Sequence, residues 1–201
     1  MTVVKELLYE DVRSKLKNGD ILLYKANRLV DKLIRYATKS EYSHSGIIVW
    51  WNERLMVMDA RSKTGVVIMP LSRNIARWNG DVEWYTSKKN LSKKDRERMI
   101  VFAQRELGKK YSAWQAFKVY LYEKFTSIFE RRHKNHSSSK LFCSYYVAQI
   151  YSSVGLSLTQ SKDDCFMSPA DIAESKMLEK KGVLKKSLLP RRFGRKKKST
   201  K

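Results

Sequence analysis

Short apolar runs separated by turn residues dominate the first ninety positions of the chain. Residues 21–24 are continuously apolar and follow Asn18-Gly19-Asp20, which predicts a short buried strand. Further apolar runs lie between turn signals at Asn52-Glu53-Arg54 and Ser62-Lys63-Thr64-Gly65, and the alternation predicts an antiparallel meander. The strands expected from this pattern cover residues 44–51, 55–60, 66–70 and 82–86.

Helical spacing of apolar positions marks three other stretches. Residues 4–17, 27–40 and 112–130 each repeat apolar side chains at the helical period. The last of these is rich in aromatic residues, and a stripe of this kind is typical of a helix that packs into a core. Successive antiparallel strands together with these helices indicate an α+β fold.

Capping residues define the remaining expected helices. Ser92, followed three positions later by Asp95, forms a capping box, and this helix should end at Gly108. A second helix should begin at Cys143 and end before Gly155. A short last helix is predicted at 168–171, where a serine N-cap precedes a proline in the first helical position.

The net charge of +22 is spread unevenly along the 201 residues. Residues 180–201 carry eleven Lys and Arg side chains and no acidic one, which is half of the excess. A segment of this composition is typically solvated and attracts phosphate, in nucleic acid or in an anionic membrane. We expect one catalytic domain over residues 1–184, including a basic mobile loop at 131–140, and a basic disordered tail over 185–201.

Targeting signals are not evident in the sequence. The first six residues contain no apolar signal core, and no stretch approaches the roughly 20 apolar residues of a membrane helix. Two cysteines, Cys143 and Cys165, are too few for a disulfide framework in a chain of this length. We therefore expect synthesis in a reducing cytoplasm, which the protein could leave by cell lysis or within a viral or phage particle.

Cys143 and His44 are the candidates for catalysis. Cys143 stands where a polar loop enters an amphipathic helix, and the N–H groups and dipole of a helix start favour a thiolate there. His44 heads an apolar strand, and an imidazole placed beside that thiol would complete a nucleophile and its base. We predict that these two side chains meet in the folded protein.

Asp59 is the expected partner of the imidazole. If the turn of the first hairpin is centred between Trp51 and Asn52, His44 lies directly across the ladder from Asp59. The carboxylate would then fix the tautomer of the ring and stabilise its charged form. This prediction depends on register, because a slip of one residue turns Asp59 to the other face.

Each of these residues also has a simpler explanation. A single histidine on a strand is commonly structural, a buried cysteine commonly behaves as a small apolar residue, and Asp59 is compatible with a surface position. Cys165 competes with Cys143 as the nucleophile, although the charges of Asp163 and Asp164 would raise its pKa.

Two further arrangements of the cysteines remain open. A disulfide between Cys143 and Cys165 is compatible with an oxidising setting, but it would remove the proposed nucleophile. A zinc site would need His133 and His136 together with both cysteines, and the spacing of these four residues is irregular for such a site.

The motifs around these residues follow one another in the order of a known family. Over about residues 17–178 the chain resembles the circularly permuted NlpC/P60 hydrolases of the YiiX-like branch. The strings that carry the resemblance are Asn18-Gly19-Asp20-Ile21-Leu22, Tyr42-Ser43-His44-Ser45-Gly46-Ile47, Val57-Met58-Asp59-Ala60, Leu107-Gly108-Lys109-Lys110-Tyr111-Ser112, Phe142-Cys143-Ser144-Tyr145-Tyr146-Val147-Ala148 and Ser168-Pro169-Ala170-Asp171-Ile172-Ala173.

The resemblance implies a permuted papain-like fold, in which an antiparallel sheet or partial barrel packs against helices and the histidine precedes the cysteine. It implies Cys143 as the nucleophile at a helix N-terminus, His44 as the base and Asp59 as the third polar residue, where many relatives have Glu. Related permuted enzymes include acyltransferases similar to lecithin–retinol acyltransferase. Their Asn-Cys-Glu signature is replaced here by Phe142-Cys143-Ser144.

The function expected from the sequence is thiol-dependent hydrolysis of an amide or ester, without a cofactor. The resemblance points to a cell-wall (peptidoglycan-type) peptide or a lipid as the substrate. Tyr24 and Tyr42 flank the site in sequence and are candidates for lining the substrate pocket, or for packing. The alternatives are an acyltransferase or thioesterase, or a basic binding or structural component for nucleic acid or anionic membrane on an inactive hydrolase fold.

Overall fold

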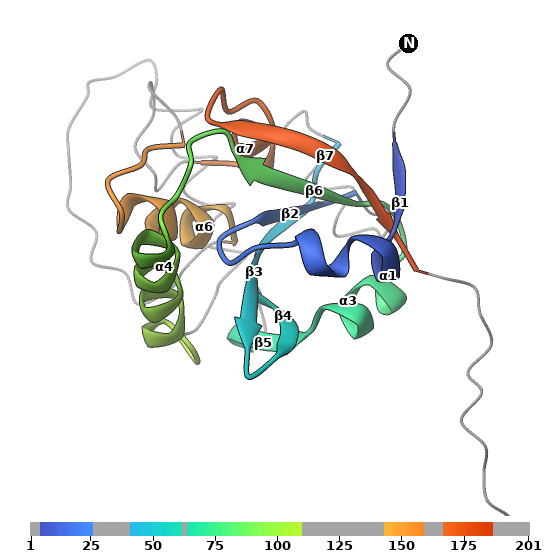
Figure 1. Cartoon of the computed structure of the whole chain (residues 1–201), viewed down its shortest axis with the longest axis horizontal. Coiled ribbons are helices and arrows are strands. Elements are labelled where there is room, and N and C mark those ends of the chain that lie inside the picture. Colours follow the sequence, from blue (N-terminus) through green and yellow to red (C-terminus); the bar gives the residue numbers. More distant parts are fainter. Residues whose placement is uncertain (1–4, 26–40, 62–63, 110–142, 159–166, 187–201) are drawn as a thin grey trace, which may run out of the picture.

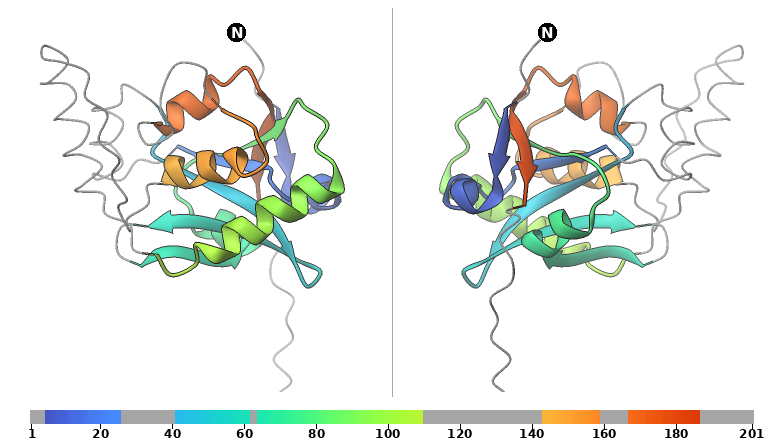
Figure 2. Two further views of the ribbon diagram at one scale, coloured as in Figure 1. Left: turned by 90° about the vertical axis from the view of Figure 1, so that its left-hand side faces the viewer. Right: turned by 90° about the vertical axis from the view of Figure 1, so that its right-hand side faces the viewer.

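A sheet of seven strands forms the centre of the described part of the protein, with helices on both faces (Figures 1 and 2). The computed structural model describes residues 5–25, 41–61, 64–109, 143–158 and 167–186. The strand order is β1-β7-β6-β2-β3-β4-β5. The strands are β1 (Glu6–Leu8), β2 (Ile21–Tyr24), β3 (His44–Trp51), β4 (Arg54–Arg61), β5 (Gly65–Pro70), β6 (Val82–Ser87) and β7 (Leu178–Lys185).

The helices divide the core into two apolar layers. One layer lies between the sheet and helices α4 and α6, and the other lies between the opposite face of the sheet and helices α1 and α3. Because both faces are covered, neighbouring residues of β3 such as Ile47 and Ile48 are both fully buried. The helices are α1 (Tyr9–Val12), the 3₁₀ turn η1 (Arg13–Lys15), α3 (Leu71–Arg77), α4 (Lys93–Arg105), α6 (Cys143–Ser152) and α7 (Pro169–Ala173).

The five strands expected from the apolar runs are confirmed, but their connection is not a simple meander. β3, β4 and β5 are successive antiparallel neighbours, whereas β6 pairs with β2 on the other side of the sheet. The sheet is also mixed rather than antiparallel throughout, because β1 pairs in parallel with β7. A Cβ at Gly182 of β7 would lie only 2.5 Å from the carbonyl oxygen of Lys5, so this pairing requires a glycine there.

The helix predictions had mixed outcomes. Both capping boxes are present, with the Ser92 side chain accepting from the Asp95 N–H and the Ser168 side chain from the Asp171 N–H. The helix expected over 4–17 is wrong, since residues 6–8 form β1 before α1 and η1 begin. The helices expected at 27–40 and 112–130, the loop at 131–140 and residues 187–201 of the expected tail lie outside the described residues. The tail was expected from residue 185, but Lys185 is the last residue of β7. Within those residues, no helix is both long and apolar enough to cross a bilayer.

The β3–β4 hairpin differs in register from the sequence prediction. Its turn consists of Asn52 and Glu53, which have φ of 45° and 63°, as in a two-residue type I′ turn. Trp51 therefore pairs with Arg54, and the ladder is shifted by two residues from the expected one. His44 does not lie directly across from Asp59, but a shift of two leaves both side chains on the same face because the side-chain period of a strand is two.

Gly46 allows β3 and β4 to approach closely at this point. A Cβ on Gly46 would lie 2.9 Å from Val57 Cγ2 and 3.3 Å from Asp59 Cβ. A larger residue would displace the Asp59 side chain from its place beside His44. The glycine therefore contributes to the position of Asp59, which lies two residues along β3 from the place expected, opposite Gly46 and not opposite His44.

Candidate active site

The first residue of β3 and the first residue of α6 meet at one end of the sheet. The Cys143 thiol forms a hydrogen bond with the His44 ring. On the other side of the ring, His44 Nε2 lies 3.4 Å from Asp59 Oδ2. Nδ1 is thus the ring nitrogen left for the sulfur. The fold brings the three residues together in the order Cys143, His44, Asp59, although the catalytic role of each stays a prediction.

Charge attraction between Cys143 and His44 outweighs the cost of their burial. Cys143 is 5% exposed, and burial alone would raise the pKa of its thiol and lower that of the His44 ring. The charge of His44 and its hydrogen bond nevertheless hold the pKa of Cys143 below its ordinary value. The charge of Cys143, with hydrogen bonds from both neighbours, raises the pKa of His44 to about 10. Both shifts therefore favour the thiolate and imidazolium forms of the pair.

Ser45 stabilises the same thiolate from the next position of β3. Its backbone N–H lowers the pKa of Cys143 by hydrogen bonding to the sulfur. The Ser45 hydroxyl is buried and has no hydrogen-bond partner within the described residues. Two successive residues of β3, His44 and Ser45, thus favour the charged form of the sulfur.

Arg61 holds the carboxylate of Asp59 from the side opposite His44. Its Nε lies 2.7 Å from Asp59 Oδ1 and its Nη2 lies 2.9 Å from Oδ2, a bidentate arrangement. Asp59 is only 1% exposed, and burial favours its neutral form. The hydrogen bonds and charges of His44 and Arg61 nevertheless lower its pKa, so Asp59 remains an anion.

Tyr24 lies behind the imidazole and does not face an open pocket. Its side chain is fully buried, its ring centroid is 5.3 Å from that of His44, and Trp78 packs on it at 4.7 Å. Burial and the nearby charge of Asp59 raise the pKa of Tyr24 well above its ordinary value, and its buried hydroxyl has no hydrogen-bond partner among the described residues. This geometry favours the packing explanation for Tyr24 over contact with a substrate.

Tyr42 is part of a neighbouring polar cluster centred on Glu83. The Tyr42 hydroxyl donates to Glu83 Oε2 at 2.7 Å and lies 2.9 Å from the Tyr85 hydroxyl. Lys25 and Lys180 place their ammonium groups 3.1 and 2.8 Å from Glu83 Oε1. Burial would raise the pKa of Glu83, but hydrogen bonds from Lys180, Tyr42 and Lys25 lower it. Tyr42 is half-buried beside the site, two residues before His44.

The sequence reasoning missed Ser45 and Arg61. Arg61 carries a readable signal, because residues two apart on a strand share a face and Arg61 follows Asp59 at that spacing. Ser45 carries a weaker one, since a residue adjacent to His44 on a strand is expected on the opposite face. Ser45 lies beside the sulfur because the first residue of α6, Cys143, packs against the first residues of β3.

The other cysteine arrangements can be followed only in part. Cys143 is a free thiol. Cys165, His133 and His136 lie outside the described residues. Among the side chains that are described, no group of three or more His, Cys, Asp or Glu has an arrangement suited to a metal ion.

Comparison with known proteins supports the same fold. The family model described as "Permuted papain-like amidase enzyme, YaeF/YiiX, C92 family" matches residues 15–192. Among solved structures, the chain is similar to the metalloprotein yiiX from Escherichia coli O157:H7, with a TM-score of 0.65 and 21% identity. The similarity covers 85% of this chain and 98% of that chain, and at this identity it concerns the fold. Comparison with curated proteins gives no match.

Proposed function

The chain belongs to the family of permuted papain-like amidases, YaeF/YiiX, and from this premise we propose that it hydrolyses an amide or ester through the thiol of Cys143. Membership of an amidase family supports hydrolase activity in general. The assignment of Cys143, His44 and Asp59 to the reaction, and the choice of substrate, are our proposal.

The observation that carries the proposal is the contact between Cys143 and His44, in which each residue shifts the pKa of the other toward its charged form. A thiolate is the nucleophilic form of cysteine, and the neighbouring imidazole favours its formation. Asp59 lies against the far nitrogen of the ring at 3.4 Å, where it stabilises the imidazolium and fixes its orientation. An inert buried cysteine would have its pKa raised by burial, whereas the pKa of Cys143 is lowered.

In the first half of the proposed reaction, the Cys143 sulfur attacks the carbonyl carbon of the substrate and forms a C–S bond. The carbonyl electron pair moves to oxygen, and the backbone N–H of Cys143, the first described residue of α6, would donate to that oxyanion. When the intermediate collapses, the bond to the leaving nitrogen or oxygen breaks. The His44 imidazolium gives its proton to that leaving atom.

In the second half, water releases the acyl group from Cys143. The now neutral His44 takes a proton from water as the oxygen attacks the thioester carbonyl. The C–S bond then breaks and a carboxylic acid leaves. The thiolate and imidazolium are restored, so one water is consumed for each bond cleaved. If an alcohol or amine replaced this water, the same residues would act as an acyltransferase.

The substrate classes we propose are a peptidoglycan-type peptide and an acyl lipid. To separate them, purified peptidoglycan and a panel of phospholipids are each incubated with the protein, and the products are analysed by mass spectrometry. New peptide ends would identify a peptide amidase. Release of fatty acid without change in the peptide would identify a lipid hydrolase.

Cys165 offers a matched control for this experiment. Cys143→Ala should abolish turnover and labelling of residue 143 by limiting iodoacetamide at neutral pH, whereas Cys165→Ala should leave both within about twofold of the wild type. Equal labelling of the wild type and Cys143→Ala, or turnover that survives in Cys143→Ala, would contradict the proposed nucleophile.

The strongly basic sequence favours a second function that is compatible with the first, which is binding to an anionic polymer or membrane. Half of the net charge of +22 lies in residues 180–201. Contacts with phosphates predict an affinity that falls linearly with the logarithm of salt concentration. Removing residues 187–201 should flatten this slope for DNA, RNA or anionic vesicles. An unchanged slope would exclude the terminal segment as the binding element.

A further inference from the structure

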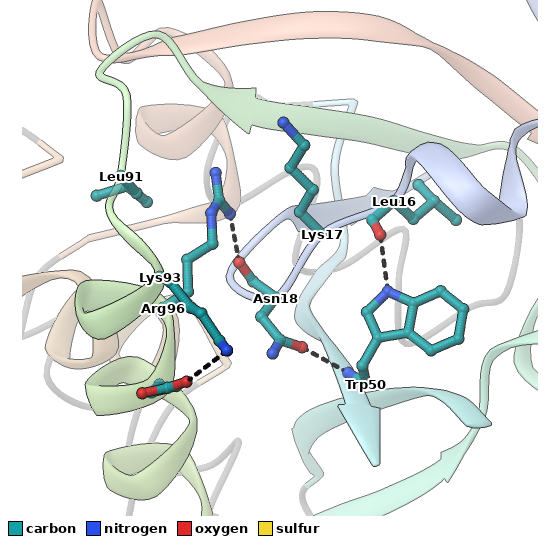
Figure 3. A pocket seen from close by; sticks show the side chains of 8 residues that line it. Leu16, Lys17, Asn18, Trp50, Leu91, Lys93 and Arg96 are labelled. Atoms are coloured by element: carbon teal, nitrogen blue, oxygen red, sulfur yellow. Dashed lines mark hydrogen bonds and ion pairs between the residues drawn. The ribbon is translucent and has the colours of Figure 1, made fainter. Parts of the chain in front are cut away.

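A pocket lies far from Cys143, between the start of α4 and the end of β3 (Figure 3). Its volume is about 390 Å³. His44 and Trp50 are at opposite ends of β3, six residues apart, which separates the pocket from the imidazole by roughly 20 Å. Eight residues line the pocket: Leu16, Lys17, Asn18, Trp50, Leu91, Lys93, Arg96 and Glu97.

Positive charge predominates in this pocket. Lys17, Lys93 and Arg96 face one acidic residue, Glu97, so three positive charges against one negative leave a net charge of +2. Lys93 is 92% exposed and its Nζ lies 4.0 Å from Glu97 Oε1, a distance at which the pair is weak. Within the described chain, the Lys17 ammonium has no ion-pair partner. Both lysines are thus available to a ligand.

The remaining residues give the pocket a fixed shape. Asn18 Oδ1 accepts a hydrogen bond from the Trp50 backbone N–H at 2.6 Å, which leaves the Asn18 amide NH₂ group as a donor. The Trp50 indole N–H donates to the Leu16 carbonyl at 2.8 Å and so holds its ring in place. Arg96 bonds to the Asn18 carbonyl and joins α4 to this loop (Figure 3).

We propose that this pocket binds a phosphate ester. The ammonium group of Lys17, that of Lys93 with its weak pairing to Glu97, and one amide donor match the charge and the acceptors of a phosphate group. The Trp50 ring and the side chains of Leu16 and Leu91, which also line the pocket, would contact the carbon part of the ester. The volume of about 390 Å³ accommodates a phosphate together with a small organic group.

A phosphate ester of this kind has two sources, a soluble phosphomonoester and a phospholipid headgroup. The soluble source is tested by titrating the full chain with glycerol 3-phosphate while the Trp50 indole N–H and Asn18 amide signals are followed by NMR. The lipid source is tested by sedimentation with phosphatidylglycerol vesicles and with phosphatidylcholine vesicles. Saturable movement of the two NMR signals, or association with the anionic vesicles, is the expected result.

The controls separate this pocket from the general positive charge of the protein. The double variant Lys17→Gln/Lys93→Gln removes two cations that line the pocket. The control Lys15→Gln/Lys94→Gln removes two exposed cations that lie within two residues of Lys17 and Lys93 in sequence but do not line the pocket. We expect the first pair to weaken binding about tenfold and the second pair less than about twofold. Glu97→Gln should tighten binding a few-fold, because it removes the one acid of the pocket.

Each outcome has a definite meaning. Loss confined to Lys17→Gln/Lys93→Gln in the glycerol 3-phosphate titration supports a soluble ligand, and the same loss with vesicles supports a headgroup. Equal losses in the two double variants would overturn the proposal, since binding would then follow net charge alone. Binding to neither ligand would overturn it as well. Amidase activity is not needed for either measurement, so the result is independent of the role proposed for Cys143.

Discussion

Asp20 and Asp59 are buried to the same degree, each 1% exposed, but the pKa values of their carboxyl groups are shifted in opposite directions. Burial raises the pKa of Asp20, and the hydrogen bonds that oppose it come from uncharged donors on Lys17, Thr86 and Trp84. Its nearest cation in the described structure, Arg96, is 3.8 Å away. The pKa of Asp59 is lowered, because His44 and Arg61 bind it directly.

This difference shows what separates a structural carboxylate from one suited to chemistry. Asp20 connects the loop before β2 to β6 by accepting hydrogen bonds from uncharged donors. These bonds require an oxygen acceptor, but the acceptor does not have to carry a negative charge. Asp59 must remain negative to support a charged imidazole, and only cationic partners can maintain that charge in a buried position. The following substitutions test this distinction.

The largest difference is expected when each aspartate is replaced by asparagine. Both carboxylate oxygens of Asp59 accept from N–H donors. In Asp59→Asn the new NH₂ group would therefore face a donor of His44 or Arg61, and the negative charge would be lost. We expect kcat/KM to fall about 100-fold. In Asp20→Asn the amide can donate to the Thr86 hydroxyl, and activity should stay within about threefold. Steady-state kinetics would check this, and equal losses would contradict it.

A smaller effect is expected on the pH dependence of the thiol. In the wild type, alkylation of Cys143 should persist below the ordinary pH range of a thiol, because its pKa is lowered. Turnover should decline again as the pH rises through about 10, where His44 loses its proton. In His44→Gln the burial of Cys143 is no longer opposed by the imidazolium, so its pKa rises. The alkylation rate at pH 7 should fall about tenfold. An unchanged pH profile would contradict the ion pair.

Arg61 should influence the reaction through Asp59 alone. Arg61→Gln removes the bidentate charge that keeps Asp59 ionised, and we expect a loss of about fivefold in kcat together with a shifted pH profile. Arg61→Lys keeps the charge but has a single nitrogen, which cannot reproduce the bidentate contact, so its loss should be smaller than that of Arg61→Gln. Arg73→Gln, an exposed arginine on α3, is the control. A loss in kcat without any change in the pH profile would indicate a merely structural role for Arg61.

The smallest expected difference is in stability against acid. Asp59 has a lowered pKa when folded, so its contribution to stability is present above the unfolded value and is lost as the pH falls through the folded one. Asp20 has a raised pKa when folded, so its ionisation costs stability at neutral pH, and this cost is relieved on acidification. Urea unfolding at neutral and acidic pH would measure the free energy of unfolding of each Asn variant relative to the wild type. On acidification this difference should change in opposite directions for Asp20→Asn and Asp59→Asn, by an amount on the order of 1 kcal/mol in each case.

Much of the fold was predictable because local signals agree with the tertiary structure. The apolar runs of β2 to β6 and the capping boxes at Ser92 and Ser168 are determined by nearby residues. β7 was not predicted, because its sequence LEKKGVLK has no clear alternation of apolar and polar residues. Its position is set by pairing with β6 and β1, which are distant in sequence.

The candidate site was predictable in its members and less so in its geometry. The helix start at Cys143 and the strand start at His44 are visible in the sequence, and the structure brings them together. The register of the β3–β4 hairpin was wrong by two residues because Glu53 adopts a positive φ, which a glutamate rarely does. The bidentate contact from Arg61 does not depend on that register, because Arg61 and Asp59 share a face of β4, and it was missed although their spacing is visible in the sequence.

The parallel pairing of β1 with β7 gives the first residues of the chain a protective role. β7 lies between β6 and β1, so without β1 its outer row of N–H and C=O groups would be left open (Figure 1). Exposed strand edges recruit strands from other molecules. Shortening the protein from its amino end would therefore favour self-association and precipitation, even though no residue near Cys143 is touched.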